Sequence, residues 1–329
     1  MAKARSITLP DTAMVTLWCR ANEARRDGAI IDDPIAIELL DAIDYDYSQF
    51  SLVARRDIAL RAVAFDASAK SYLAAHPRAT VVALGEGMQT SFWRLDAAGL
   101  GDRFRWVTVD LPPIIELRAR LLPQSPRISA CAQSVLDFSW MDRVDPDNGV
   151  FVSAEGLLPY LSPGEALGLL RECARRFPGG QMIFDLPSKL QAALARHWIW
   201  PALRGGWPRT PFSLSAREIA DLPKTVPGVR AVRNIPPPRG QGAPLDQLLW
   251  PLVDRPPAAR VRVAIDGPSS RCAPDSQQRM ILSYRPTDQQ REGWRTWRFA
   301  DPSRQSRSPS RPLSSVSPRP LRSPAPPSW

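Results

Sequence analysis

Short apolar runs alternate with amphipathic segments in the middle of the chain. The runs begin at residues 80, 106, 127, 149 and 181 and read TVVALG, WVTVDL, RISACA, GVFVSAEGLL and QMIFDL. Each contains a segment of strand length, and the stretches between them have the three- and four-residue apolar spacing of helices. This alternation predicts an α/β fold that is Rossmann-like and doubly wound, with a mainly parallel sheet. Ligands of such sheets bind at the carboxyl ends of the strands.

Apolar residues also recur at helical spacing before residue 78. The segments are Thr12–Arg26, Asp33–Ile43 and Ala54–Ala75. Asp32 or Asp33, followed by Pro34, is a candidate helix N-cap. These helices either pack on the sheet or form a lid over a ligand cleft. We expect residues 1–78 to be a helical N-terminal lid region and residues 79–285 to carry the sheet.

The chain after Pro187 has a less regular pattern. Residues 213–222 have helical spacing, with Ser213 or Ser215 as the cap, and residues 229–236 have the pattern of a strand. Beyond them, either RVRVAI (260–265) or RMILSY (279–284) is able to close the sheet.

The composition is that of a globular protein with a sizeable core, since 44% of the 329 residues are hydrophobic. The apolar runs are far shorter than the roughly 20 residues of a membrane helix. The N-terminal sequence MAKARSITLP lacks the apolar stretch of a signal peptide. We therefore expect no membrane partner and a cytoplasmic location.

The formal net charge of +10 is concentrated at one end of the chain. Residues 287–329 hold eight arginines and three acidic residues, which is half of that charge. From Asp301 onward the sequence is almost entirely Ser, Pro and Arg, a composition that cannot bury a core. We predict a disordered tail over residues 286–329, and we expect nucleic acid as a partner only through that tail.

Cysteine and histidine do not suggest metal chemistry. The four cysteines show no CxxC spacing, and His76 and His197 are the only histidines. The sequence also lacks the G-x-S-x-G turn of many serine hydrolases. We expect no metal site and no Ser-His-Asp triad.

Three candidate ligand-binding positions follow strands. Gly85 and Gly87 after the first strand allow the backbone to pass close to a ligand. Asp110 ends the second strand, where an acid accepts hydrogen bonds from ribose hydroxyls in Rossmann-like folds. Glu155 follows the fourth strand and either lines the cleft or caps a turn. Position 90 is Thr, so the G-x-G-x-x-G fingerprint of dinucleotide binding is incomplete.

Four motifs together resemble the leucine carboxyl methyltransferase superfamily, and within it the bacterial branch of tetracenomycin polyketide-synthesis O-methyltransferases. They are LGEGMQTSFWRLD, VTVDLPPIIELRARLLP, SVLDFSW and SAEGLLPYLS, and the resemblance runs from about Val15 to Gly242. It implies a class I methyltransferase that uses S-adenosylmethionine. By this likeness Gly85 and Gly87 line the methionine part of the cofactor, and Asp110 holds its ribose.

The same resemblance assigns four more residues. Val135 and Leu136 would flank the adenine, and Glu155 would complete the cofactor pocket. Arg61, in IALRAVAFD, matches the arginine that binds the cofactor carboxylate from the lid helices. A guanidinium suits a bidentate grip on a carboxylate, and the alternative is a solvated helix residue.

Two positions depart from the family pattern. Gln89 stands where the family usually has Asp before the threonine of the glycine loop, which keeps hydrogen bonding but loses a charge. The likeness also ends after about Asp254. We hypothesise that a reading-frame change or a divergent tail replaced the usual last strands.

The resemblance implies an oxygen acceptor, carboxyl or hydroxyl, on a small molecule such as a polyketide-like or other secondary metabolite. A carboxylate acceptor needs no general base, whereas a hydroxyl benefits from one, and His197 and Tyr160 are the candidates. The segment 197–207 (HWIWPALRGGW) either lines an apolar acceptor pocket or forms a core helix. The oligomeric state is left open.

Three other functions compete with an active methyltransferase. One is a nucleic-acid or acidic-partner binding protein that acts through the basic tail. Another is a nicotinamide-dependent oxidoreductase, which the incomplete glycine fingerprint disfavours. The third is a catalytically impaired scaffold that binds the cofactor without turnover, an alternative that Gln89 and the divergent C-terminus leave open.

Overall fold

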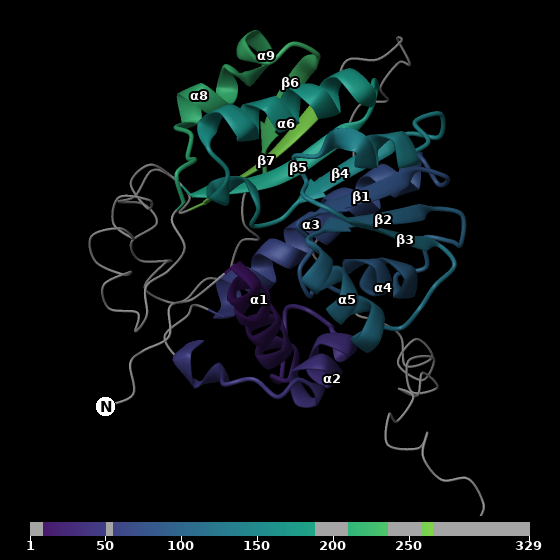
Figure 1. The fold of residues 1–329 in the computed structure, drawn as a ribbon, viewed down its shortest axis with the longest axis vertical. Helices are drawn as coiled ribbons and strands as arrows, with labels where there is room; N and C mark the ends of the chain where they lie inside the picture. The colour runs from purple at the N-terminus through teal and green to yellow at the C-terminus, as the bar shows by residue number, and fades with distance from the viewer. Residues whose placement is uncertain (1–8, 51–54, 188–209, 236–257, 266–329) are drawn as a thin grey trace, which may run out of the picture. The chain divides into compact units, whose positions relative to one another are not determined.

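A seven-stranded sheet of order β3-β2-β1-β4-β5-β7-β6 organises the computed structural model, which describes residues 9–50, 55–187, 210–235 and 258–265 (Figure 1). The strands are β1 Thr80–Leu84, β2 Arg105–Asp110, β3 Ile128–Ala132, β4 Val150–Ala154, β5 Gln181–Pro187, β6 Val229–Asn234 and β7 Ala258–Ile265. Strands β1 to β5 pair in parallel, and β7 runs antiparallel to both β5 and β6. The predicted α/β, mainly parallel fold is confirmed.

The last strands of the sheet are present. RVRVAI forms most of β7, with Asp185 opposite Arg260 in the register. Strand β7 begins at Ala258, after the point where the family likeness ends, so the sheet has a strand beyond that point. The hypothesis of a reading-frame change or a divergent tail stays a prediction. RMILSY, the segment 197–207 and the predicted tail lie outside the described residues.

Helices cover both faces of the sheet. They are α1 Leu9–Ala24, α2 Pro34–Ala42, α3 Arg55–Ala75, α4 Ser91–Ala97, α5 Pro112–Leu121, α6 Pro163–Arg176, α8 Ala216–Ala220 and α9 Leu222–Thr225, with 3-10 turns η1 Tyr47–Phe50, η2 Phe138–Arg143 and η3 Leu158–Tyr160. Helices α1 to α5 contribute to one apolar cluster, and α6, α8 and α9 contribute to the other. The N-terminal helices thus pack on one face of the sheet.

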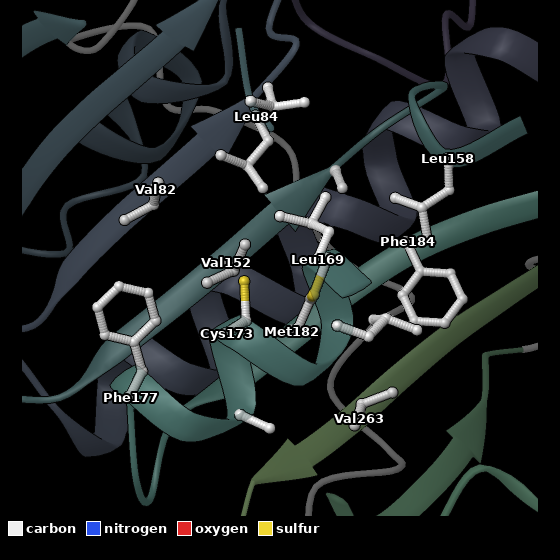
Figure 2. Packing of buried hydrophobic residues seen from close by; sticks show 14 of the residues in the cluster. Val82, Leu84, Val152, Leu158, Leu169, Cys173, Phe177, Met182, Phe184 and Val263 are labelled. Carbon is white, nitrogen blue, oxygen red and sulfur yellow. The ribbon is translucent and has the colours of Figure 1, made fainter. Parts of the chain in front are cut away.

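Alternation along the strands divides the core between the two faces. On β1, Val81 and Ala83 join the cluster under α1 to α5, whereas Val82 and Leu84 join the one under α6. Figure 2 shows Leu169 of this second cluster packed among the strand residues. Apolar side chains therefore cover both faces of the sheet, whereas polar groups lie at the carboxyl ends of the strands.

Helix caps agree with the sequence signals. Asp33 caps α2, since its Oδ1 accepts the backbone N–H of Ala36 at 3.1 Å, and Pro34 is the first helical residue. Ser215 begins α8 with a reciprocal capping box to Glu218.

No helix in the described part of the chain is both long and apolar enough to span a membrane. The cytoplasmic location stays a prediction.

Candidate functional site

The loop between β1 and α4 needs glycine at two positions. Gly85 and Gly87 have φ of 58° and 54°, in the left-handed region that side chains disfavour. A Cβ on Gly85 would lie 2.9 Å from Cδ1 of Leu157, and one on Gly87 would lie 3.1 Å from Cβ of Ala13. The loop therefore passes close to the neighbouring segments in a way that only glycine permits.

Asp110 ties this loop to the end of β2. Its Oδ2 accepts the backbone N–H of Gly87, and its Oδ1 accepts that of Leu111, each at 2.7 Å. Burial raises the pKa of Asp110, and the two backbone N–H groups and Arg118 only partly oppose that effect. Each carboxylate oxygen retains a further lone pair, so the group is able to accept hydroxyl donors as well.

Arg118 of α5 fixes the other side of the loop. Its Nη1 donates to the carbonyl oxygens of Gly87 at 2.7 Å and of Gln89 at 2.9 Å. Its Nη2 lies 3.0 Å from Oε1 of Glu86, whose Oε2 accepts the hydroxyl of Thr108 at 2.6 Å. The loop conformation is thus held by a buried cation as well as by its glycines.

Glu155, after β4, is held by helix α3. Nε of Arg61 donates to its Oε1 at 2.9 Å, and Nη1 of Arg61 donates to Oδ2 of Asp185 at 3.2 Å. Burial alone would lower the pKa of Arg61, but Asp185 and Glu155 outweigh it and raise it. Gly156 has φ of 65°, and a Cβ there would lie 3.2 Å from Nη1 of Arg61.

Sequence reasoning missed Asp185. Its Oδ1 accepts the backbone N–H of Gly156 at 2.6 Å, so it positions both Arg61 and the loop that carries Glu155. The signal was present, because an acid near the end of the apolar strand QMIFDL matches the pattern that identified Asp110.

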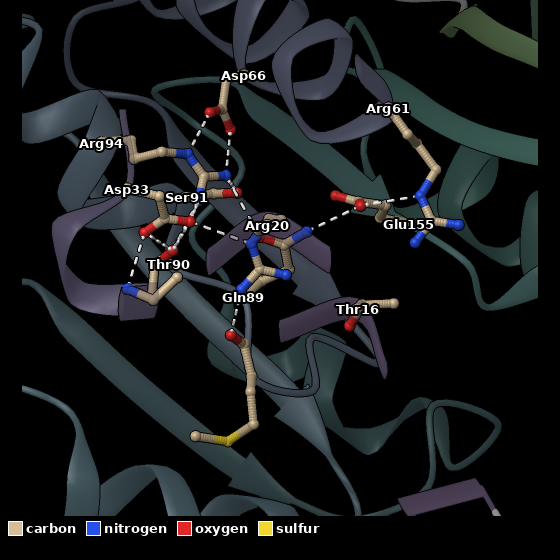
Figure 3. A network of polar contacts seen from close by, with 12 residues as sticks. Thr16, Arg20, Asp33, Arg61, Asp66, Gln89, Thr90, Ser91, Arg94 and Glu155 are labelled. Atoms are coloured by element: carbon tan, nitrogen blue, oxygen red, sulfur yellow. Dashed lines mark hydrogen bonds and ion pairs between the residues drawn. The ribbon is translucent and has the colours of Figure 1, made fainter. Parts of the chain in front are cut away.

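Gln89 joins Glu155 to a second polar cluster, as Figure 3 shows. Its Nε2 donates to Oε1 of Glu155 at 2.8 Å, and its Oε1 accepts Nη2 of Arg94 at 3.3 Å. Arg94 in turn pairs with Asp66 of α3 at 2.6 Å and with Asp33 at 2.7 Å. The polar contacts therefore run without a break from the N-terminal helices to Glu155.

Asp33 is the buried centre of that cluster, with a side chain 1% exposed. It accepts Nε of Arg20 at 3.1 Å and the hydroxyl of Thr90 at 2.6 Å. Burial would raise the pKa of Asp33, but Arg94, Arg20 and the Thr90 hydroxyl outweigh it and lower it. Nη2 of Arg20 donates to the carbonyl of Met88 at 2.6 Å, which anchors the glycine loop to α1.

The structure brings most of the predicted site residues to the carboxyl ends of the strands. A small hollow there includes Gly85 and Glu155 of the predicted residues, and its full lining is Ala83, Leu84, Gly85, Glu86, Gln89, Ser91, Trp106, Ser153 and Glu155. Val135 is buried and Leu136 is half-buried at the apolar cluster under α6. The backbone N–H of Gln133 donates to the carbonyl of Asp110, which ties the segment after β3 to the end of β2. Tyr160 ends η3 and interacts electrostatically with Arg61. His197 lies outside the described residues.

Comparisons with known proteins identify a family. The family model for leucine carboxyl methyltransferase matches residues 13–174. The tetracenomycin polyketide synthesis O-methyltransferase of Streptomyces glaucescens is 36% identical over 187 residues, which cover 56% of this chain and 68% of that protein. An S-adenosyl-L-methionine-dependent methyltransferase of Gibberella zeae is 27% identical over 241 residues, covering 67% and 79%.

Among solved structures, a DUF574 family protein from Streptomyces avermitilis superposes with a TM-score of 0.50 at 13% identity. The match covers 80% of this chain and 98% of that chain. At this identity the likeness concerns the fold alone.

Proposed function

The chain belongs to the leucine carboxyl methyltransferase family and is an S-adenosylmethionine-dependent methyltransferase, and from that premise we propose that it methylates an oxygen of a small molecule. The observation that carries the assignment of the site is the Asp110 carboxylate, joined to the glycine loop by the N–H of Gly87. An acid in this place suits the two hydroxyls of a ribose.

The residues present fit the nucleoside half of the cofactor. Asp110 is only 8% exposed, so it is largely shielded from water, and its oxygens retain lone pairs that are able to accept hydrogen bonds from a ligand. Val135, which is buried, and Leu136, which is half-buried, follow β3, and Ala132 of that strand lies opposite Asp110. We propose that Asp110 takes the ribose and that Val135 and Leu136 flank the adenine.

The charges fit the methionine half. Arg61 lies between Glu155 and Asp185, so this group of three carries one net negative charge. S-adenosylmethionine carries two positive groups, a sulfonium and an ammonium, and one carboxylate, so its net charge is positive. A negatively charged site favours such a ligand. Two of the Arg61 N–H groups are used by the acids, and the remaining donors are suited to the cofactor carboxylate.

When bound, S-adenosylmethionine supplies an electrophilic methyl group on its sulfonium. The protein contributes position, because in-line displacement depends on holding the acceptor oxygen close and aligned. Gly85 and Gly87 keep the loop backbone free of side chains there, and Asp185 fixes Arg61 and the loop of Glu155. A carboxylate acceptor needs no further group, whereas for a hydroxyl we propose Tyr160 as the described candidate base.

The acceptor class rests on the relatives. The Streptomyces protein acts in polyketide synthesis by its name. We propose a carboxyl or hydroxyl group of a polyketide-like secondary metabolite as the acceptor.

Calorimetric titration with S-adenosylhomocysteine tests the site. We expect micromolar binding by the wild type, and at least about tenfold weaker binding by Asp110→Ala and Glu155→Ala, since a lost charge-assisted hydrogen bond amounts to about 1.5–3 kcal/mol. Glu172→Ala on α6, where Glu172 is partly exposed and pairs with the exposed Arg175, is the control and should bind as the wild type does. A folded wild type that does not bind would overturn the proposal.

The acceptor is then tested with methyl-labelled S-adenosylmethionine and a panel of aromatic acids and phenols. A carboxyl acceptor gives a methyl ester that releases labelled methanol in alkali, whereas a hydroxyl acceptor gives an ether that does not. Label transferred only to nitrogen or carbon would contradict the assignment to oxygen.

A further inference from the structure

The Gln89 side chain lies between two groups of opposite charge. Its amide nitrogen donates to Oε1 of Glu155 at 2.8 Å, and its amide oxygen accepts from Nη2 of Arg94 at 3.3 Å (Figure 3). The residue is 6% exposed, so both contacts are shielded from water. Such shielding strengthens each contact.

Only one orientation of this amide satisfies both neighbours. A reversed amide would place its NH₂ group against the guanidinium of Arg94 and its oxygen against the carboxylate of Glu155. Both contacts would then be repulsive. The charges on either side therefore fix the direction in which Gln89 donates.

Arg94 does not need a charge at position 89. Asp66 and Asp33 already pair with it at 2.6 and 2.7 Å. Glu155, by contrast, needs donors, and the two that it has in the described residues converge on one oxygen. Nε of Arg61 and Nε2 of Gln89 both donate to Oε1, at 2.9 and 2.8 Å, and no described hydrogen bond reaches Oε2.

We propose that Gln89 is a positioning residue for Glu155: its uncharged amide holds Oε1 beside Arg61 and thereby leaves Oε2 for the positively charged end of the cofactor. This inference rests on the proposed function, because it assigns Glu155 to the cofactor site. A carboxylate at position 89 would face Glu155 instead of donating to it.

The inference predicts a specific pH effect for Gln89→Glu, which differs from Gln by one atom. When its carboxyl is protonated, this side chain is able to donate to Glu155 as the amide does. When it ionises, two carboxylates face each other, and the donor is lost. Glu155 favours the protonated form of the new carboxyl, and Arg94 favours the ionised form. The variant should therefore bind progressively worse than the wild type as the pH rises through the pKa of this carboxyl.

Other charges act on Glu155 and must be unchanged in the comparison. Those that interact with it are Arg20 on α1, Arg61 on α3, Arg94 on α4 and Arg260 on β7, and Asp185 of β5 shares Arg61. Taking the ratio of wild-type to variant affinity at each pH removes their common contribution.

The experiment is calorimetric titration of S-adenosylhomocysteine into wild type, Gln89→Glu and Gln89→Leu across pH 5.5 to 8.5, with thermal unfolding of each. For Gln89→Glu the ratio of wild-type to variant affinity should rise to about tenfold as the pH rises. For Gln89→Leu it should be about tenfold at every pH, because that side chain never donates. Gln124→Glu and Gln124→Leu, at an exposed amide that bonds Ala119 and Leu122 carbonyls, are the controls.

A Gln89→Leu variant with wild-type affinity, or a Gln89→Glu deficit that does not change with pH, would overturn the inference while wild-type binding still supports the proposed function. Failure of the wild type to bind would overturn both. If Gln89→Leu does not fold, the pH course of Gln89→Glu decides the question alone.

Discussion

The backbone N–H of Gly87 donates to Oδ2 of Asp110 over 2.7 Å. This bond joins the loop after β1 to the acid at the end of β2, whose strands pair in parallel with Leu84 opposite Val109. The glycine loop and the acid are therefore one unit, and a change at either position should be felt at the other.

The first prediction concerns the pH dependence of cofactor binding. Burial raises the pKa of Asp110, and hydroxyl donors bind its ionised form. The affinity for S-adenosylhomocysteine should therefore fall as the pH is lowered through that raised pKa, at a higher pH than an ordinary Asp near 3.9 would give. Calorimetry from pH 5 to 8 measures this. Asp110→Asn should bind weakly throughout and lose this pH dependence, and an unchanged pH course in that variant would contradict the assignment.

The second prediction separates the cost of a positive φ from the cost of a steric clash at Gly85 in the glycine loop. Gly85→Ala combines a φ of 58° with a Cβ 2.9 Å from Leu157, whereas Gly99→Ala meets a φ of 73° with nothing within 4 Å. Gly99→Ala should lower the free energy of unfolding by about 1–2 kcal/mol, and Gly85→Ala by clearly more, with loss of S-adenosylhomocysteine binding. Gly164→Ala, in open space at the start of α6, should be neutral or stabilising. Denaturant unfolding measures all three, and equal effects at 85 and 99 would refute the collision.

The third prediction concerns the buried ion pairs of Asp33. Asp33→Asn leaves Arg20 and Arg94 short of a counter-charge in a buried place, which should lower the free energy of unfolding by about 3–5 kcal/mol. Glu172→Gln, whose partner Arg175 is exposed, should change it by less than about 1 kcal/mol. Unfolding in guanidinium chloride measures both variants. If Asp33→Asn and Glu172→Gln lowered the free energy of unfolding equally, the Asp33 cluster would contribute no more than a surface pair.

The lowered pKa of Asp33 also sets the direction in which the free energy of unfolding changes with pH. Its pKa is lowered in the folded protein, since Arg94, Arg20 and Thr90 outweigh the effect of burial. Its contribution is therefore fully present above the unfolded value near 3.9 and is lost as the pH falls through the lower folded value. Wild type should lose stability over this acid range, and Asp33→Asn should lose less.

The fourth prediction concerns the thiols. Cys19, Cys131 and Cys173 are buried, and burial raises the pKa of Cys173 far above its ordinary value. In the native protein these three should not react with a thiol reagent at pH 8, and in denaturant they should. Mass spectrometry of labelled peptides identifies the sites, and rapid native labelling at Cys173 would contradict the packing of α6.

The strands and the ends of the helices follow from local signals. Apolar runs, Asp33 before Pro34 and Ser215 before Glu218 each predict an element from neighbouring residues, and the structure has those elements. The family likeness added the site residues, and in the structure Gly85 and Glu155 line one small hollow, while Asp110 is bonded to Gly87.

The polar cluster could not be predicted in this way. Asp33, Asp66 and Arg94 come from three separate elements and meet only when the N-terminal helices pack on the sheet. Nothing in the local spacing of any one of them names its partner. From sequence, Gln89 keeps hydrogen bonding but loses a charge. Its part in linking Arg94 to Glu155 depends on a contact between residues that are 66 positions apart.

The antiparallel strand β7 has a consequence for synthesis on the ribosome. In the described sheet β6 has no strand neighbour except β7, and β7 lies between it and β5 although it comes after both in the chain. The sheet therefore cannot close until residue 265 has left the exit tunnel, and the nascent chain must wait with the edge of β5 unpaired. A stop codon between residues 235 and 258 would remove β7 and leave β6 without its neighbour in the described sheet.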